Sequence, residues 1–143
     1  IDWDLIRSFE SPPRSQEVLG IFRQALSDAT LEDGLMLAPI KEMADRDAIA
    51  QVADFLLPTE GVDVVITYGI RRTKVILSAR TTDPNLHIGR ELSQLFPVGK
   101  AGGHKSLAGG QIPFEDLKCI NSEEALAKMS QILRSHFGGE EDE

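Results

Sequence analysis

A glycine-rich stretch, residues 99–110, holds the residue types in this chain best suited to binding an anion. Five of its twelve residues are glycine, and Lys100, His104 and Lys105 lie among them. Glycine lets the backbone take positive φ and approach a ligand closely, and successive N–H groups in such a turn can converge on one anion. Lysine and histidine side chains add further donors. The stretch predicts a loop that holds a phosphate or carboxylate; a plain connecting loop is the alternative that composition alone favours.

Spacing excludes two widespread phosphate-binding motifs. The stretch has no Gly-Lys-Ser/Thr run four residues after a first glycine, as a P-loop requires, and no Gly-x-Gly-x-x-Gly fingerprint.

Two motifs resemble those of one family. Residues 101–109 resemble the Gly-Gly-Gly-His-x-x-Ala-Ala-Gly signature of the DHH-associated (DHHA) domain, with Ala101 in place of the first glycine and Leu107 in place of the first alanine. Residues 78–81, Ser-Ala-Arg-Thr, resemble the family's Ser-x-Arg-Ser strand end. That domain follows the catalytic domain in DHH phosphoesterases, which include RecJ-type exonucleases, oligoribonucleases and cyclic-dinucleotide phosphodiesterases, and a related domain ends alanyl-tRNA synthetases. The resemblance covers roughly residues 34–137.

The resemblance implies that substrate binding and hydrolysis are carried out by different domains. In the family this domain binds the substrate, while the DHH domain holds manganese ions and performs hydrolysis. Residues 1–33 would then be a lead-in segment and helix that follow a missing upstream DHH domain, and residues 34–143 would be the substrate-binding domain with its acidic tail. The substrate-binding residues it implies are Ser78, Arg80, Gly102, Gly103, His104 and Lys105. The planar guanidinium of Arg80 would grip two phosphate oxygens; the alternative for Arg80 is an ordinary ion pair at the end of a strand. No catalytic residue, metal ligand or cofactor is expected in this chain, and manganese is expected in the missing domain.

The distribution of histidines bears on catalysis. Hydrolysis by two metal ions needs several Asp and His ligands close together. The three histidines are far apart, and no Asp-His-His run occurs. Asp45-Arg46-Asp47 is interpreted as a helix start, where carboxylates complement the helix dipole. We therefore expect this chain alone to hydrolyse nothing.

The composition of the chain limits the kinds of partner that we expect it to bind. The net charge of −8 counts against a general nucleic-acid coat, which needs a positive field. The single cysteine, Cys119, excludes an intrachain disulfide. The sequence shows neither a membrane span nor a signal peptide, so a cytoplasmic protein without a membrane partner is predicted. The expected partners are a nucleic acid or nucleotide phosphate and the upstream DHH domain, with a homodimer as a further option.

Hydrophobic periodicity and turn residues predict an α/β fold in a single domain, with a mixed sheet of about four to five strands flanked by helices. The apolar hairpin strands should be central, because strands without alternation are usually covered on both faces. The expected elements are a helix capped by Ser15, a strand at 35–39, a helix from Asp45 to before Pro58, a hairpin of 62–68 and 74–80, a helix from Asp83-Pro84 to Pro97, a strand near 109–113 and a last helix after Asn121.

The leading hypothesis is a substrate-binding domain of a DHH-family phosphoesterase. Two alternatives stay open at this point. One is a non-catalytic RNA-binding module like the synthetase domain that grips tRNA. The other is a dimerisation domain whose glycine-rich loop is purely structural.

Overall fold

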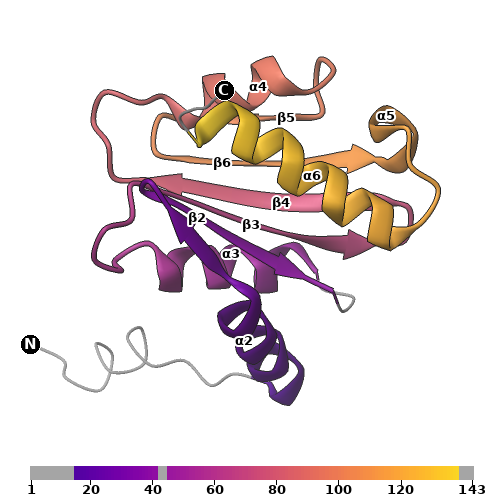
Figure 1. Cartoon of the computed structure of the whole chain (residues 1–143), viewed down its shortest axis with the longest axis horizontal. Helices are drawn as coiled ribbons and strands as arrows, with labels where there is room; N and C mark the ends of the chain where they lie inside the picture. The colour runs from indigo at the N-terminus through magenta and orange to yellow at the C-terminus, as the bar shows by residue number, and fades with distance from the viewer. Residues whose placement is uncertain (1–14, 42–44, 139–143) are drawn as a thin grey trace, which may run out of the picture.

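The structure is a computed structural model that describes residues 15–41 and 45–138. It is a mixed α/β domain built on a six-stranded sheet in the order β1-β2-β3-β4-β6-β5 (Figure 1). The predicted lead-in, residues 1–14, and the acidic tail, residues 139–143, lie outside the described residues. The elements are α2 (Gln16–Asp28), β1 (Thr30–Glu32), β2 (Leu35–Ile40), α3 (Arg46–Leu56), β3 (Val64–Arg71), β4 (Lys74–Thr81), α4 (Ile88–Leu95), β5 (Ala101–Gly103), β6 (Leu107–Pro113), α5 (Phe114–Leu117) and α6 (Ser122–Phe137).

The β3–β4 hairpin is the centre of the sheet, as its apolar runs predict. Strand β2 lies parallel to β3, and every other pair of neighbouring strands is antiparallel. Successive side chains of a strand point to opposite faces. The hairpin therefore contributes side chains to two hydrophobic cores, one on each face of the sheet. Figure 1 shows α6 crossing in front of the strands. Together α4, α5 and α6 cover one face of the sheet, and α2 and α3 cover the other.

Side-chain caps fix three helix starts where the sequence places them. The Ser15 hydroxyl accepts a hydrogen bond from the Val18 N–H at 3.1 Å. The Asp45 carboxylate accepts from the Ala48 N–H at 2.9 Å, and the Asn121 side chain accepts from the Glu124 N–H at 2.8 Å. Each cap satisfies an N–H group that the first helical turn leaves without a partner.

The predicted start of α4 at Asp83-Pro84 is wrong. The Asp83 carboxylate accepts from the Asn85 N–H at 2.8 Å and closes a local turn instead. The helix begins at Ile88, where the ring Nδ1 of His87 accepts from the Arg90 N–H at 3.0 Å. Two short edge strands, β1 and β5, raise the strand number from the predicted four to five to six.

Tyr68 provides a test of the core. It is the only tyrosine of the chain and is buried. Burial raises the pKa of its phenol above the ordinary 10.0, against smaller lowering effects of the Ser130 hydrogen bond and Arg134. Between the two pKa values the folded state keeps a proton that the unfolded state loses, so stability should fall as the pH rises above about 10. We expect phenolate absorbance to appear above pH 10 in the native protein and near pH 10 in denaturant; coincident titrations would contradict the burial.

Candidate anion-binding site

Arg80 lies near the end of β4, on the face that α3 covers, and is 7% exposed. Its Nε donates to the Asp54 carboxylate on α3 at 2.7 Å, and its Nη1 donates to the Ala79 carbonyl at 2.9 Å. A guanidinium has five N–H donors. Within the described ranges no acceptor is recorded for Nη2, so its two N–H groups are available to a ligand.

A pocket of about 290 Å³ opens beside Arg80 and is lined by residues of α3, β4 and β6. Register brings the two predicted motifs together there, because Arg80 pairs with Leu107 and Ser78 pairs with Gly109. Ser78, Arg80 and Gly109 all line the pocket, together with Arg46 and Asp47 from the first turn of α3. The sequence motifs that are separated in the chain therefore face one cavity.

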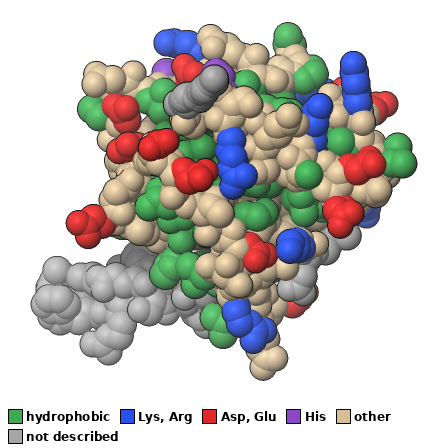
Figure 2. Space-filling model, in the orientation of Figure 1, with side chains coloured by type: hydrophobic (Ala, Val, Ile, Leu, Met, Phe, Trp, Pro, Cys, Tyr) green, Lys and Arg blue, Asp and Glu red, His purple; other side chains and the backbone are tan. Residues whose placement is uncertain are grey.

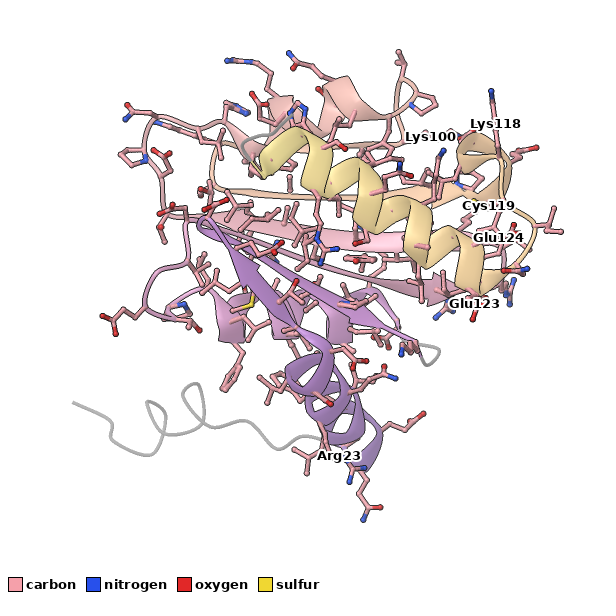
Figure 3. The ribbon with its side chains drawn as sticks, viewed as in Figure 1. Arg23, Lys100, Lys118, Cys119, Glu123 and Glu124 are labelled. Carbon is pink, nitrogen blue, oxygen red and sulfur yellow. The ribbon has the colours of Figure 1, made fainter. Side chains whose placement is uncertain are left out.

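The glycine-rich stretch lines a second, adjoining pocket of about 450 Å³. Gly102 pairs with Gly109 across β5 and β6, which places bare backbone on the same face as Ser78. Lys100 also lines this pocket, and Figure 3 shows it at the β5 side of the molecule, far from Arg23 on α2. Since β5 is the edge strand, part of its backbone N–H groups point away from β6.

The start of α4 holds the loop in place. The Ile88 N–H donates to the Lys105 carbonyl and the Gly89 N–H to the His104 carbonyl, both at 2.9 Å. Gly103 has φ +151°, and a Cβ there would lie 2.7 Å from the Ala108 Cα. Glycine is therefore required at position 103 by the close approach of β6.

The remaining predicted site residues lie outside the lining of both pockets. The side chains of His104 and Lys105 are exposed, and neither residue lines either of the two pockets. The His104 N–H donates to the Leu107 carbonyl at 2.8 Å and closes the β5–β6 turn. The structure thus gathers Ser78, Arg80 and Gly102 and leaves the other predicted residues beside them.

Three residues of this site were missed by sequence reasoning. Arg46 and Asp54 come from α3, and Gly89 comes from α4. The pattern of charges at a helix start gave Arg46 only a structural interpretation. Pairing of Arg80 with Asp54, 26 residues earlier, depends on how α3 crosses the sheet, and no local signal reports that.

The described residues do not fit a manganese site. In residues 15–41 and 45–138, no group of three His, Cys, Asp or Glu side chains is placed to hold a metal ion. Among the described helices, none has the length and apolar character needed to cross a membrane.

Comparison with known proteins gives a consistent picture. A family model described as "DHHA1 domain" matches residues 32–137. The chain is 34% identical over 130 residues to the uncharacterized protein MJ1633 of Methanocaldococcus jannaschii; the match covers 90% of this chain and 27% of that protein. The chain thus spans about a quarter of the length of this relative.

Solved structures of low sequence identity share the fold. An exopolyphosphatase-related protein from Bacteroides fragilis is 18% identical with a TM-score of 0.70, covering 94% of this chain and 39% of that one. A pGpG-specific phosphodiesterase from Vibrio is 16% identical with a TM-score of 0.50, covering 82% and 39%. The C-Ala domain of Aquifex aeolicus alanyl-tRNA synthetase is 18% identical with a TM-score of 0.51, covering 74% and 97%.

Proposed function

The chain belongs to the DHHA1 domain family, and from that membership we propose that it is the substrate-binding domain of a DHH-family phosphoesterase. It binds a nucleotide or nucleic-acid phosphate and presents it to an upstream DHH domain. Arg80 holds the phosphate with Nη2, and Ser78 and the Gly102–Gly103 backbone supply further donors. His104 and Lys105, exposed between β5 and β6, supply further side-chain donors. The buried Arg80 in an open pocket is the observation that carries this proposal.

The chemistry of Arg80 supports a holding role. A cation that is almost fully buried beside a cavity costs desolvation energy unless it is paired. Asp54 is its ion-pair partner, but the Asp54 side chain is 65% exposed. An anion in the pocket would complete the pairing by accepting a charge-assisted hydrogen bond from Nη2. The backbone at Gly109 lets such a ligand approach the sheet without meeting a side chain.

In this proposal the upstream DHH domain, and not this chain, carries out the hydrolysis. There, manganese would supply an activated water for attack on phosphorus, as in exonucleases and phosphodiesterases of the family. The part played by this chain is to orient the phosphoester and restrict its motion, which lowers the entropic barrier to attack. The cytoplasmic location and the homodimer stay predictions from the sequence.

Similarity of fold to the C-Ala domain favours one second candidate, a tRNA-binding module without catalysis. Tight binding of tRNA requires an extended positive surface. Figure 2 shows acidic and basic side chains mixed on the α6 side of the molecule, without a continuous basic patch on the face in view. Salt-sensitive binding of tRNA that exceeds binding of AMP would favour this candidate over the phosphoesterase.

Calorimetric titration with AMP tests the proposed function. The wild-type chain should bind AMP, and Arg80→Lys should lower the affinity about tenfold, because an ammonium keeps the charge but loses the planar fork. Arg23→Gln, which removes an exposed arginine of α2 (Figure 3), is the matched control and should leave the affinity unchanged. Equal affinities of the wild type and a folded Arg80→Lys variant would refute the role of Arg80.

A further inference from the structure

Three pockets of the sheet face adjoin one another around Arg46. The pocket beside Arg80 and the pocket along the glycine-rich stretch share Arg46 and Gly109. A third pocket, of about 350 Å³, includes Arg71 and Gln111 and shares Arg46 with both. The three together form a groove, defined here as the Arg46 groove, that runs from Arg80 past Arg46 toward Arg71.

Arg46 is the cation common to all three pockets of this groove. It is exposed, and in the described part of the chain it forms no ion pair. The neighbouring Asp45 carboxylate is occupied by the cap of α3, and Asp54 is occupied by Arg80. Asp47 is the acidic neighbour whose carboxylate has no recorded partner among the described residues.

We propose that Arg46 forms a second phosphate subsite and that the ligand of the groove is a short single-stranded oligonucleotide. This inference rests on the proposed function, in which Arg80 holds one phosphate. A mononucleotide would fill the pocket beside Arg80 and leave the other two pockets to solvent. A ligand with at least two linked phosphates places the first at Arg80 and the next at Arg46, with Lys100 on the flank.

The lining of the groove favours an oligonucleotide over an inorganic polyphosphate. Ala50, Ile76 and Leu107 line the pocket between the two arginines, and Leu107 is 46% exposed. Apolar surface of this kind is stabilised by contact with a sugar or a base, whereas a polyphosphate has only charged oxygens to offer. Leu107, which stands where the family signature has alanine, enlarges this apolar surface.

The charge balance limits the length of the ligand. Arg80, Arg46, Lys100 and Arg71 provide the positive charge of the groove, and Asp45 and Asp47 at the start of α3 oppose it. Each phosphate contact with a single strand contributes about 0.7 to the slope of log affinity against log salt. We therefore expect a slope of about 1.4 for two contacts, well below that of a protein that coats long strands.

Binding of AMP and of 5′-phosphorylated diadenylate by the full chain tests the proposal. The wild type should bind diadenylate about tenfold more tightly than AMP. Arg46→Gln should lower the affinity for diadenylate five- to tenfold and reduce the salt slope by about 0.7; its affinity for AMP, whose pocket Arg46 also lines, should fall by a clearly smaller factor. Arg23→Gln is the matched control and should leave both affinities unchanged.

Two results would overturn the second subsite. One is a diadenylate affinity that Arg46→Gln leaves unchanged. The other is tripolyphosphate binding as tightly as diadenylate, which would identify the ligand as a bare polyphosphate. Either can occur while AMP binding still depends on Arg80, so failure of this inference is distinguishable from failure of the proposed function, in which Arg80→Lys leaves AMP binding intact.

Discussion

Replacing Gly89 with alanine is expected to lower the free energy of unfolding by about 3 kcal/mol, the upper part of the usual range for an overpacked position. A Cβ at this position would overlap the carbonyl group of Gly103 and lie 2.8 Å from the His104 carbonyl oxygen. These are backbone atoms, so a change of rotamer cannot relieve the clash. Either α4 or the glycine-rich loop must move, and the hydrogen bond from Gly89 N–H to the His104 carbonyl is lost.

Gly20 offers a matched control, because it is also a glycine within a helix. A Cβ at Gly20 would meet no atom within 4 Å. Gly20→Ala should therefore raise the free energy of unfolding by about 0.5–1 kcal/mol, the ordinary gain of alanine over glycine within a helix. Urea denaturation of both variants measures the difference. A Gly89→Ala variant as stable as the wild type would show that α4 does not seat tightly on the loop.

The same pair of variants separates stability from binding. Under conditions in which Gly89→Ala is still folded, its affinity for AMP should fall, since Gly102 is carried on the strand that leads into the displaced loop. Gly20→Ala should bind AMP as the wild type does. Loss of stability with full affinity for AMP would mean that the loop position does not matter for the ligand.

The sequence predicts those parts of the fold that are determined by residues close together in the chain. The β3–β4 hairpin, the caps at Ser15, Asp45 and Asn121, and the flanking helices all depend on residues close together in the chain, and each is found in the structure. The strand β5 does not have such a signal. Ala101–Gly103 has little β propensity and is a strand because it pairs with β6 and packs against α4, which also bonds the residues that follow it.

The residues of the site also fall into those that local sequence signals predict and those that only tertiary packing places. Ser78, Arg80 and the glycines stand out because their types and motifs are visible in the sequence. Their partners in the site come from helices that cross the sheet or pack against the loop. These partners are Asp54, Gly89 and Arg46. Their role depends on tertiary packing, which neither periodicity nor spacing reports.

The second large effect is expected when the ion pair between Arg80 and Asp54 is broken. Asp54→Ala leaves the Nε of a buried guanidinium without an acceptor, and should cost about 2 kcal/mol of unfolding free energy, as expected for a lost hydrogen bond to a charged group. The side chain of Arg80 then keeps only its Nη1 hydrogen bonds to the Ala79 and Ala108 carbonyls, so its orientation is less restrained. We expect the affinity for AMP to fall about tenfold, although a negative charge has been removed from the neighbourhood of the phosphate.

Asp54→Asn separates orientation from charge. The amide oxygen can still accept from Nε, so Arg80 keeps its position, while the repulsion between the carboxylate and a bound phosphate disappears. At a separation of several Å in water that repulsion is below about 1 kcal/mol, so affinity for AMP should rise about threefold. Asp47→Asn, which removes an exposed charge from the same pocket without contacting Arg80, should give a similar rise and little loss of stability.

The opposite signs of the two Asp54 variants are the critical result. If Asp54 acted only through its charge, alanine and asparagine would both tighten the binding of AMP. If it acted only as a structural ion pair, both would destabilise the fold and neither would change affinity in the folded protein. Weaker binding with alanine and tighter binding with asparagine, measured by calorimetry at one salt concentration, would assign Asp54 as the residue that positions Arg80 for its ligand.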